Sequence, residues 1–490
     1  MPLTYGEKRA MNEIASVLES QWSNGMLPQI RFVPGQTGYS PDEEEWGVTA
    51  KISGNSKVKT SGITQPPNIA FALWEVFNSS QNKKELLPFL KEFYPKLKQY
   101  HDFLLTERDP KKEGLASVFH PWATGSDNTP CYDLVVKRAG KELRAKGFEQ
   151  RIKKRKDAVY VSKGQRPKEK DYEAYGRLLG FFVAKEYDQK KLWKECPFVV
   201  QDILFNCIFK ESLSAMIGIA EALSLEKEKK LNEKLALKVG DAIRNKLYDE
   251  ETGLFYSFDV KGNSLIKIAT VHSLAPLFGK IASKEQAKEL IKHLKSEKEF
   301  NPKNGFMIPS VPLDAEEFNP VGYARGPVWP VRNWIVAKGL ENYDKALAKK
   351  VREQTIALIA QGFKDVKELE KLASSLMEYN SFNESFTTPS KTQYCHGWLW
   401  DSGFAAIGWS KVREKPDSEI WKNVDLRKKA LRKEGANSGE MKKVLTREFQ
   451  MPLFDEYFAP VTSKEGKAGM PLGSEKMTWT AALLLDLLHS

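Results

Sequence analysis

Hydrophobic residues recur at three- and four-residue spacing along most of the chain, the period that places them on one face of an α-helix. Strict alternation, which is typical of half-buried strands, is scarce and short. The pattern predicts helices over residues 8–20, 67–78, 84–106, 171–188, 202–225, 228–247, 284–296, 329–361, 365–379, 398–411 and 477–488. No fixed-period repeat is present, so these elements predict a closed helical toroid rather than a solenoid.

The composition fits one large globular domain. The chain has 490 residues, of which 41% are hydrophobic and 29% charged, enough to bury a substantial core and too apolar for a disordered protein. No run approaches the roughly 18 apolar residues of a membrane span, and the first residues, MPLTYGEKRAMNE, lack the apolar core of a signal peptide. We therefore expect a cytoplasmic protein without a membrane partner.

The sequence carries no recognisable metal or nucleotide signature. Its four cysteines form no CxxC pair, and its six histidines form no HExxH motif. A GxGxxG, a Walker loop and a GxSxG are also missing. We expect no metal, no cofactor and no disulfide framework.

The net charge of +12 is concentrated in one segment. Residues 137–170 contain 14 basic and 4 acidic side chains. The run RIKKRK at 151–156 lacks the interleaved aromatics of a nucleic-acid platform, so a solvated surface is the simpler interpretation, and attraction of an anionic ligand or nucleic acid is the alternative. We delimit 134–170 as a basic insertion or cap and expect no nucleic-acid partner.

The predicted connections are rich in residues that bind sugars. Each combines Trp, Tyr, Gln or Arg with Asp or Glu, the mixture that stacks on a sugar ring and hydrogen-bonds its hydroxyls. One such loop is readily explained as a capped helix end, but six together favour a carbohydrate site. They cover residues 21–32, 62–68, 120–133, 322–334, 393–404 and 454–460.

Two of these loops offer the carboxyl groups that hydrolysis of a glycosidic bond requires, one acid and one base or nucleophile. In HPWATGSDNTP the candidate is Asp127, with Trp122 available to exclude water and raise its pKa. The alternative for Asp127 is an ordinary Asx turn. In FDEYFAP the adjacent acids Asp455 and Glu456 are candidates, and the alternative is a surface turn that caps a helix.

The segments QWSNGMLP, TQPPNIA, HPWATGSDNTP, DILFN, RGPVWPVRNW, WLWDSGF, DEYF and TWTAALLLDLL together resemble glycoside hydrolase family 63, most closely its bacterial mannosylglycerate and glucosylglycerate hydrolases. HPWxxGxDNxP and RGPVWP are long and rare patterns, and the resemblance covers most of the chain. It implies an all-α fold, a single (α/α)6 barrel, that hydrolyses an α-linked glucose or mannose with inversion.

The resemblance also implies roles for particular residues. Asp127 would be the general acid and Glu456 the general base. The sugar would be held by the YxxxWLWD loop, helped by the glutamine of TQPP and by the YxRGPVW loop, which together contribute Tyr394, Trp398, Trp400, Asp401, Gln65, Tyr323, Arg325 and Trp329.

Family members that cleave glycerate glycosides carry an RPxxxxY motif, whose Arg and Tyr grip the glycerate carboxylate. This chain has RPKEKDY, which gives Arg166 and Tyr172. An arginine fork matches a carboxylate, and the surrounding positive charge attracts an anionic substrate. The alternative is a helix start with Pro167 in its first turn. Tyr39 is a weaker candidate for the same subsite.

The sequence departs from the family pattern in three places. Ala324 stands where the family usually has a Trp in YxRGPVW, and Ala123 where many members have Glu. The third departure is the order of segments, because the family carries WLWD near its N-terminus. Here residues 364–450 carry it, so the chain is expected to be permuted, with the Lys/Glu-rich stretch 422–443 as an exposed connection.

These observations predict an inverting α-glycosidase that acts on a small anionic α-glucoside or α-mannoside such as glucosylglycerate or mannosylglycerate. The alternatives are an α-glucosidase for a neutral disaccharide or oligosaccharide, and a carbohydrate-binding protein with impaired catalysis. A small carbohydrate is the expected partner, and a homo-oligomer remains open.

Overall fold

The computed structural model describes residues 2–32, 40–153, 155, 164–382, 397–452, 454–455, 457–463, 467–472 and 478–489. Within this part of the chain the protein is mostly helical, and its strands are two or three residues long. The predicted predominance of helices is confirmed.

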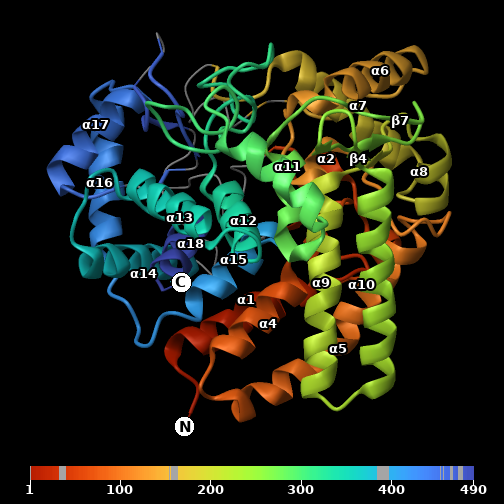
Figure 1. The fold of residues 1–490 in the computed structure, drawn as a ribbon, viewed down its shortest axis with the longest axis horizontal. Coiled ribbons are helices and arrows are strands. Elements are labelled where there is room, and N and C mark those ends of the chain that lie inside the picture. Colours follow the sequence, from red (N-terminus) through yellow and green to blue (C-terminus); the bar gives the residue numbers. More distant parts are fainter. Residues whose placement is uncertain are drawn as a thin grey trace.

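Six helices follow one another in a closed circuit of contacts (Figure 1). In spatial order they are α4 (Ile69–Ser79), α9 (Ile203–Ala222), η4 (Val271–Lys280), α12 (Pro330–Leu340), α18 (Thr478–Leu488) and α15 (Leu399–Trp409), which packs against α4 again. The sequences explain this inner position, since α9, α15 and α18 are apolar on nearly every side, as a helix buried on several faces must be.

A second set of helices covers this circuit from outside. They are α1 (Tyr5–Glu19), α5 (Lys83–Thr106), α10 (Glu226–Lys246), α11 (Lys284–Lys295), α13 (Lys345–Ala360) and α14 (Val366–Phe382). α10 illustrates the pattern, because it buries Ala236, Val239 and Ile243 against α9 and keeps its lysines and glutamates on the opposite face. The amphipathic sequences therefore occupy the outer layer and the apolar ones the inner layer.

The chain does not visit the inner helices in their spatial order. α15 precedes α18 in sequence, yet α18 lies next to α12 and α15 lies beyond it, against α4 and α1. The contact between α1 and α15 is close at Gly6, where a Cβ would lie 2.1 Å from the carbonyl oxygen of Trp409. A helix from the C-terminal part of the chain therefore sits between two helices from its start.

Further helices lie on the connections: α2 (Glu43–Trp46), α3 (Ala50–Ser53), η1 (Pro121–Thr124), η2 (Pro130–Tyr132), α6 (Asp133–Ala145), α7 (Glu169–Ala184), α8 (Gln189–Glu195), α16 (Glu419–Lys433) and α17 (Ser438–Phe449).

The short strands pair within loops. β1 (Ile30–Phe32) joins β2 (Lys59–Thr60) to β8 (Gly397–Trp398), which ties the WLWD segment to the N-terminal part of the chain. The other pairings, all antiparallel, involve β3 (Val200–Gln201), β4 (Tyr248–Asp249), β5 (Leu254–Phe255), β6 (Phe258–Asp259), β7 (Ser264–Leu265), β9 (Tyr457–Phe458) and β10 (Pro471–Leu472).

Two of the predicted elements were wrong. The single helix predicted over 329–361 is two helices, α12 and α13, because the chain turns at 341–343 and Asp344 caps α13 by accepting from the N–H of Leu347 at 3.0 Å. The stretch 422–443 is not an exposed connection. It lies in α16 and α17, which bury Trp421, Leu431 and Leu445.

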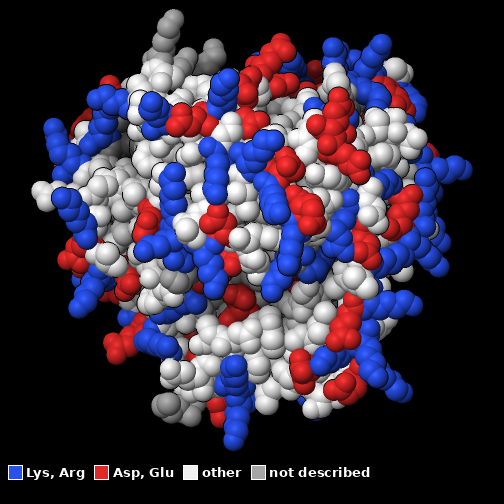
Figure 2. All heavy atoms as spheres, in the orientation of Figure 1, with Lys and Arg blue, Asp and Glu red and all other residues white. Residues whose placement is uncertain are grey.

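The basic segment 134–170 contains most of α6, which packs against α7. Several of its arginines have acidic partners: Arg138 pairs with Asp259, Arg144 contacts Glu173, and Arg155 lies 3.1 Å from Glu169. On the face drawn in Figure 2, lysines and arginines are interspersed with acidic side chains. These partners favour the interpretation of this segment as a solvated surface.

Among the residues that the structure describes, one helix, α9, is long and apolar enough to span a membrane by length and composition. However, 78% of its most apolar window is buried inside the protein. It therefore behaves as a core helix.

A buried carboxylate joins three neighbours in the inner circuit. Asp486 of α18 is 2% exposed and lies 3.2 Å from the Nζ atoms of both Lys338, on α12, and Lys411, two residues beyond α15. Trp334 Nε1 donates to the same carboxylate at 3.0 Å. Burial raises the pKa of Asp486, but the two lysines and the indole outweigh it, so this pKa is held below its ordinary value.

We expect Asp486→Asn to lower the free energy of unfolding by about 3 kcal/mol at pH 7, because it leaves two lysines without their shared counter-ion. Since the folded pKa is depressed, the stability that Asp486 provides is present above the unfolded pKa and is lost as the pH falls through the folded value, below about pH 4. Urea unfolding at a series of pH values checks this. A gap between the two proteins that stays constant from pH 7 to pH 3 would contradict it.

Candidate active site

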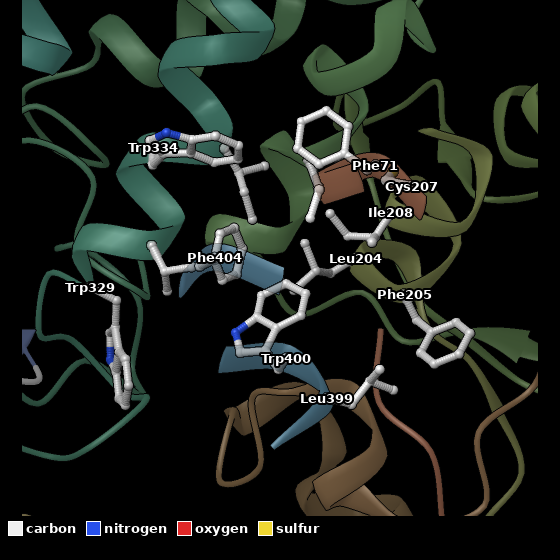
Figure 3. Packing of buried hydrophobic residues seen from close by; sticks show 14 of the residues in the cluster. Phe71, Leu204, Phe205, Cys207, Ile208, Trp329, Trp334, Leu399, Trp400 and Phe404 are labelled. Carbon is white, nitrogen blue, oxygen red and sulfur yellow. The ribbon is translucent and has the colours of Figure 1, made fainter. Parts of the chain in front are cut away.

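The inner helices enclose an aromatic cluster that positions Trp400 (Figure 3). Trp400 meets Phe404 edge to face at 4.9 Å between ring centroids, and Phe404 meets Trp334 of α12 at 5.5 Å. Phe71 of α4 packs against Trp334 from another side at 6.0 Å. Trp400 is 2% exposed, so its ring is fixed by packing rather than free to move.

The loop before α4 holds the backbone of Trp400. Asn68 Nδ2 donates to the carbonyl oxygen of Trp400 at 2.8 Å, and the N–H of Trp400 donates to Gln65 Oε1 at 3.4 Å. Asp401 follows, half-buried, in the first turn of α15. The TQPP and WLWD segments, which lie far apart in the sequence, are therefore directly bonded to each other.

Trp400 also lies against the loop that carries Asp127. Gly125 ends the helix η1 with a φ of +68°, and a Cβ at this position would lie 3.9 Å from Cδ2 of Trp400. Asp127 follows two residues later and is half-buried. The order of segments in this chain thus leaves WLWD beside the candidate acid.

The residue after Asp127 is held from several sides. The N–H of Asn128 donates to the hydroxyl of Tyr175 at 3.3 Å, and Asn128 Nδ2 donates to Asp171 at 3.3 Å. Burial raises the pKa of the Tyr175 phenol, and the negative charges of Asp127 and Asp171 raise it further. The Tyr175 phenol is therefore protonated, and the turn after Asp127 is held by fixed partners.

Arg325 supports this turn. Its guanidinium makes a two-pronged ion pair with Asp133, with distances of 2.9 and 2.5 Å, and its Nε donates to Asn128 Oδ1 at 3.3 Å. These contacts link the YARGPVW loop to the Asp127 loop. Because Arg325 is paired with Asp133, it supports the site by holding the turn that contains Asn128 in place.

Three predicted residues meet beside this loop. Trp329 is 7% exposed, and its ring meets that of Tyr323 at right angles, 5.2 Å between centroids. The guanidinium of Arg166 lies 5.0 Å from the centroid of the same Tyr323 ring. The RPKEKDY segment is therefore in contact with the YARGPVW loop.

Tyr172 and Trp122 meet on the other side of the segment. Their ring centroids are 6.3 Å apart, and the guanidinium of Arg155 stacks on Tyr172 at 3.9 Å. Trp122 is buried among His120, Tyr175 and Trp46. Trp122 is an apolar side chain in the loop that carries Asp127, and it is only 6% exposed.

The DEYF segment adjoins the same region through its backbone. Phe458 and Val328 exchange two backbone hydrogen bonds of 2.7 and 2.9 Å, which attaches β9 to the residue before Trp329. Asp455 is 1% exposed and accepts from Gln361 at 3.4 Å. Glu456, Tyr394 and Tyr39 lie outside the described residues, and only the backbone of Trp398 is described.

Arg332 was not singled out from the sequence, although it lies in the quoted segment RGPVWPVRNW. It is 4% exposed, donates from Nη2 to the carbonyl oxygen of Gly125 at 2.5 Å, and lies 5.7 Å from the centroid of the Trp400 ring. Asp202, from DILFN, is also buried, but it caps α9 and accepts from Tyr132 and Ser257, so it has a structural role.

The chemistry available at this site is that of carboxyl groups and aromatic rings. Among the described residues, no group of three or more His, Cys, Asp or Glu side chains could hold a metal ion. An acid at position 127, the aromatic rings of Tyr323 and Trp329, and an arginine at position 166 are suited to binding a sugar with an anionic substituent.

Comparisons with known proteins identify the family of the chain. The family model of the mannosylglycerate hydrolase MGH1-like glycoside hydrolase domain matches residues 3–369. The mannosylglycerate hydrolase of Rubrobacter radiotolerans is 31% identical over 72% of this chain and 79% of that protein. The glucosylglycerate hydrolase of Mycolicibacterium hassiacum is 28% identical, over 67% of this chain and 74% of that protein.

The fold has a solved counterpart. The crystal structure of a mannosylglycerate hydrolase of glycoside hydrolase family 63 from Thermus thermophilus, in complex with Tris, has a TM-score of 0.71 and 24% identity, covering 99% of this chain and 89% of that one. The family match, which spans most of the chain, and the identity to the Rubrobacter enzyme establish the classification. The chain belongs to the mannosylglycerate hydrolase MGH1-like glycoside hydrolases of family 63.

Proposed function

We propose that the protein hydrolyses the α-glycosidic bond of a small anionic glycoside, mannosylglycerate or glucosylglycerate, with inversion. The observation that carries this proposal is the contact between Arg166 and Tyr323, which brings a cation into the aromatic wall of the sugar site. A guanidinium is the side chain best suited to gripping a carboxylate, because its donors match the two oxygens.

In this proposal Asp127 is the general acid and Glu456 the general base, as the resemblance implies. The acid protonates the glycosidic oxygen as the glycerate leaves, and the base takes a proton from the water that attacks the opposite face of the sugar. The two carboxyl groups of an inverting enzyme stand roughly 6.5 to 9.5 Å apart to admit that water. Trp329 and Trp400 stack on the sugar, with Gln65 and Asp401 available for its hydroxyls.

The architecture that we propose is a permuted (α/α)6 barrel. The closed circuit of six helices inside six others supports the barrel, as does the likeness to the Thermus structure over nearly the whole chain. Two facts support the permutation. The matched family range ends at residue 369, before WLWD and DEYF. In addition, α15 precedes α18 in the sequence but follows it in the spatial order, where it lies between α18 and α4. A cytoplasmic location belongs to the same proposal.

A proton NMR time course tests this function. The wild-type protein is incubated with mannosylglycerate, glucosylglycerate and the corresponding glycerol glycosides, which lack only the carboxylate. We expect hydrolysis of at least one glycerate substrate, with the β-anomer of the sugar appearing first. Initial release of the α-anomer would refute inversion, and faster turnover of the glycerol glycosides would favour a neutral substrate.

We expect Arg166→Ala to lower kcat/KM for the preferred glycerate glycoside by about 10- to 100-fold, chiefly through KM, because a charge-assisted contact is worth about 1.5–3 kcal/mol. For the glycerol glycoside the loss should be less than about threefold, since no carboxylate is left without its partner.

Arg144→Ala is the matched control. Arg144 belongs to the same basic segment but is largely exposed and contacts Glu173, so the variant removes one positive charge without touching the site. If Arg144→Ala reproduced the selective loss, the effect would come from the general field of the segment, and Arg166 would have no direct role in binding.

A further inference from the structure

Arg332 is a buried cation with an unusual set of partners. It lies in the first turn of α12, three residues after Trp329, and is 4% exposed. Among the described residues no carboxylate lies within ion-pair distance of it, although the buried Asp202 acts on it electrostatically from farther away, and its Nη1 atom has no hydrogen-bond partner. Burying a charge without an ion pair is costly, so a position that keeps one is a candidate for a functional role.

The contacts that Arg332 does make converge on the loop of the acid. Nη2 donates to the Gly125 carbonyl at 2.5 Å, and the guanidinium lies 5.7 Å from the Trp400 ring centroid. Gly125 is the residue at which the chain leaves η1 in the left-handed conformation and turns toward Asp127. Arg332 therefore connects the RGPVW helix, the WLWD segment and the Asp127 turn.

The Asp127 turn is thereby held at both ends. On the far side of Asp127, Asn128 is fixed by Tyr175, Asp171 and Arg325. On the near side, Gly125 packs 3.5 Å from Pro66, measured from the position of a Cβ, and accepts the hydrogen bond from Arg332. The Arg332 contact restrains the turn on this side with a charged donor from the barrel wall.

We propose that Arg332 is a positioning residue for proton delivery: by holding the carbonyl of Gly125, it sets the direction from which the Asp127 carboxyl reaches the glycosidic oxygen. This rests on the proposed function of Asp127 as the acid. A shift of about 1 Å in a reacting group can cost about 100-fold in rate, so losing one end of the turn should impair protonation of the leaving group.

The proposal has a signature that a purely structural role lacks. A substrate with a poor leaving group, such as a glycerate glycoside, needs the acid, whereas an α-glycosyl fluoride does not, because fluoride departs without a proton. We expect Arg332→Lys, which retains the charge but not the reach and fork, to lower kcat on the glycerate glycoside about 100-fold with little change in KM. On the α-glycosyl fluoride, the loss should be below about threefold.

Arg332→Ala with added guanidinium chloride provides a second measurement. We expect millimolar guanidinium to restore part of kcat on the glycerate glycoside and to leave the fluoride rate unchanged. Arg108→Lys is the matched control, since Arg108 is 1% exposed and also donates to a backbone carbonyl, that of Ser117, outside the Asp127 turn. This variant should lower the melting temperature without changing the ratio of the two rates.

The proposal would be overturned if Arg332→Lys lowered kcat equally on both substrates and guanidinium did not restore the activity of Arg332→Ala. Arg332 would then only support the structure of the sugar site. The same assay applied to Asp127→Asn separates this result from a failure of the proposed function. If Asp127→Asn also lowered kcat equally on both substrates, Asp127 would not be the general acid, and the proposed function itself would fail independently of Arg332.

Discussion

Replacing Asp127 with asparagine is expected to lower kcat on mannosylglycerate or glucosylglycerate about a thousandfold, the usual contribution of a general acid. The amide has nearly the same shape and keeps the turn, but it cannot donate the proton that the leaving glycerate oxygen requires. Tyr175, Asn128 and Arg325 hold the loop independently of the Asp127 side chain, so the melting temperature should stay within a few degrees of the wild type.

The decisive measurement is the rate on an α-glycosyl fluoride of the same sugar. We expect Asp127→Asn to keep most of the wild-type rate on this substrate, because fluoride departs unaided. A variant that turns over the glycerate glycoside at near-normal speed would remove Asp127 from the mechanism. It would favour the simpler interpretation of DNTP as an Asx turn.

The second large effect is expected at Glu456. Glu456→Gln should also lower kcat about a thousandfold, because water is no longer deprotonated as it attacks the sugar. Unlike Asp127→Asn, this variant should be equally impaired on the glycosyl fluoride. Added azide, an anionic nucleophile that needs no base, should restore turnover and give the β-glycosyl azide, which NMR identifies by its anomeric proton.

Asp455→Asn is the matched control for this experiment, because it makes the same kind of change one residue away. Asp455 is buried, its carboxylate accepts from Gln361, and its backbone carbonyl accepts from Thr480. We therefore expect Asp455→Asn to reduce stability and to leave the rate with azide unchanged relative to the rate without it. If azide rescued Asp455→Asn and not Glu456→Gln, the roles of the two acids would be exchanged.

Helical periodicity predicted five of the six inner helices and the outer helices, because these have simple apolar patterns, but it missed η4, a short helix with a kink at Phe278 and Gly279. α9 is apolar throughout and α10 has one apolar stripe, so both are evident from sequence. The prediction for the segment 422–443 was wrong, since only Trp421, Val424, Asp425 and Leu431 are buried in α16 among many lysines and arginines. A narrow buried stripe is sufficient for a helix that packs on one side, and a dense run of charge conceals it.

The sequence named several loop segments that the structure brings together, but it did not reveal a residue whose contacts arise only from burial. Trp400, Gln65 and Asp127 are recognisable because they lie in the motifs WLWD, TQPP and HPWATGSDNTP, and the structure brings these segments together. Arg332 lies in a helix start that reads as ordinary, and no local pattern reveals that its partner is a carbonyl 207 residues earlier in the chain. Partners so distant in sequence are determined by tertiary packing.

The position of α15 also affects how the protein is made. α1 and α4 are synthesised before α15, which packs against both and begins only at residue 399. Until α15 has been made, the faces of α1 and α4 that contact it have no permanent cover from it. Folding must then wait for long-range contacts, which are slow to form, and the unfinished chain exposes surface that chaperones bind. The place of α15 against α1 and α4 therefore makes the completion of this part of the core depend on contacts that form only after residues 399–409 have been synthesised.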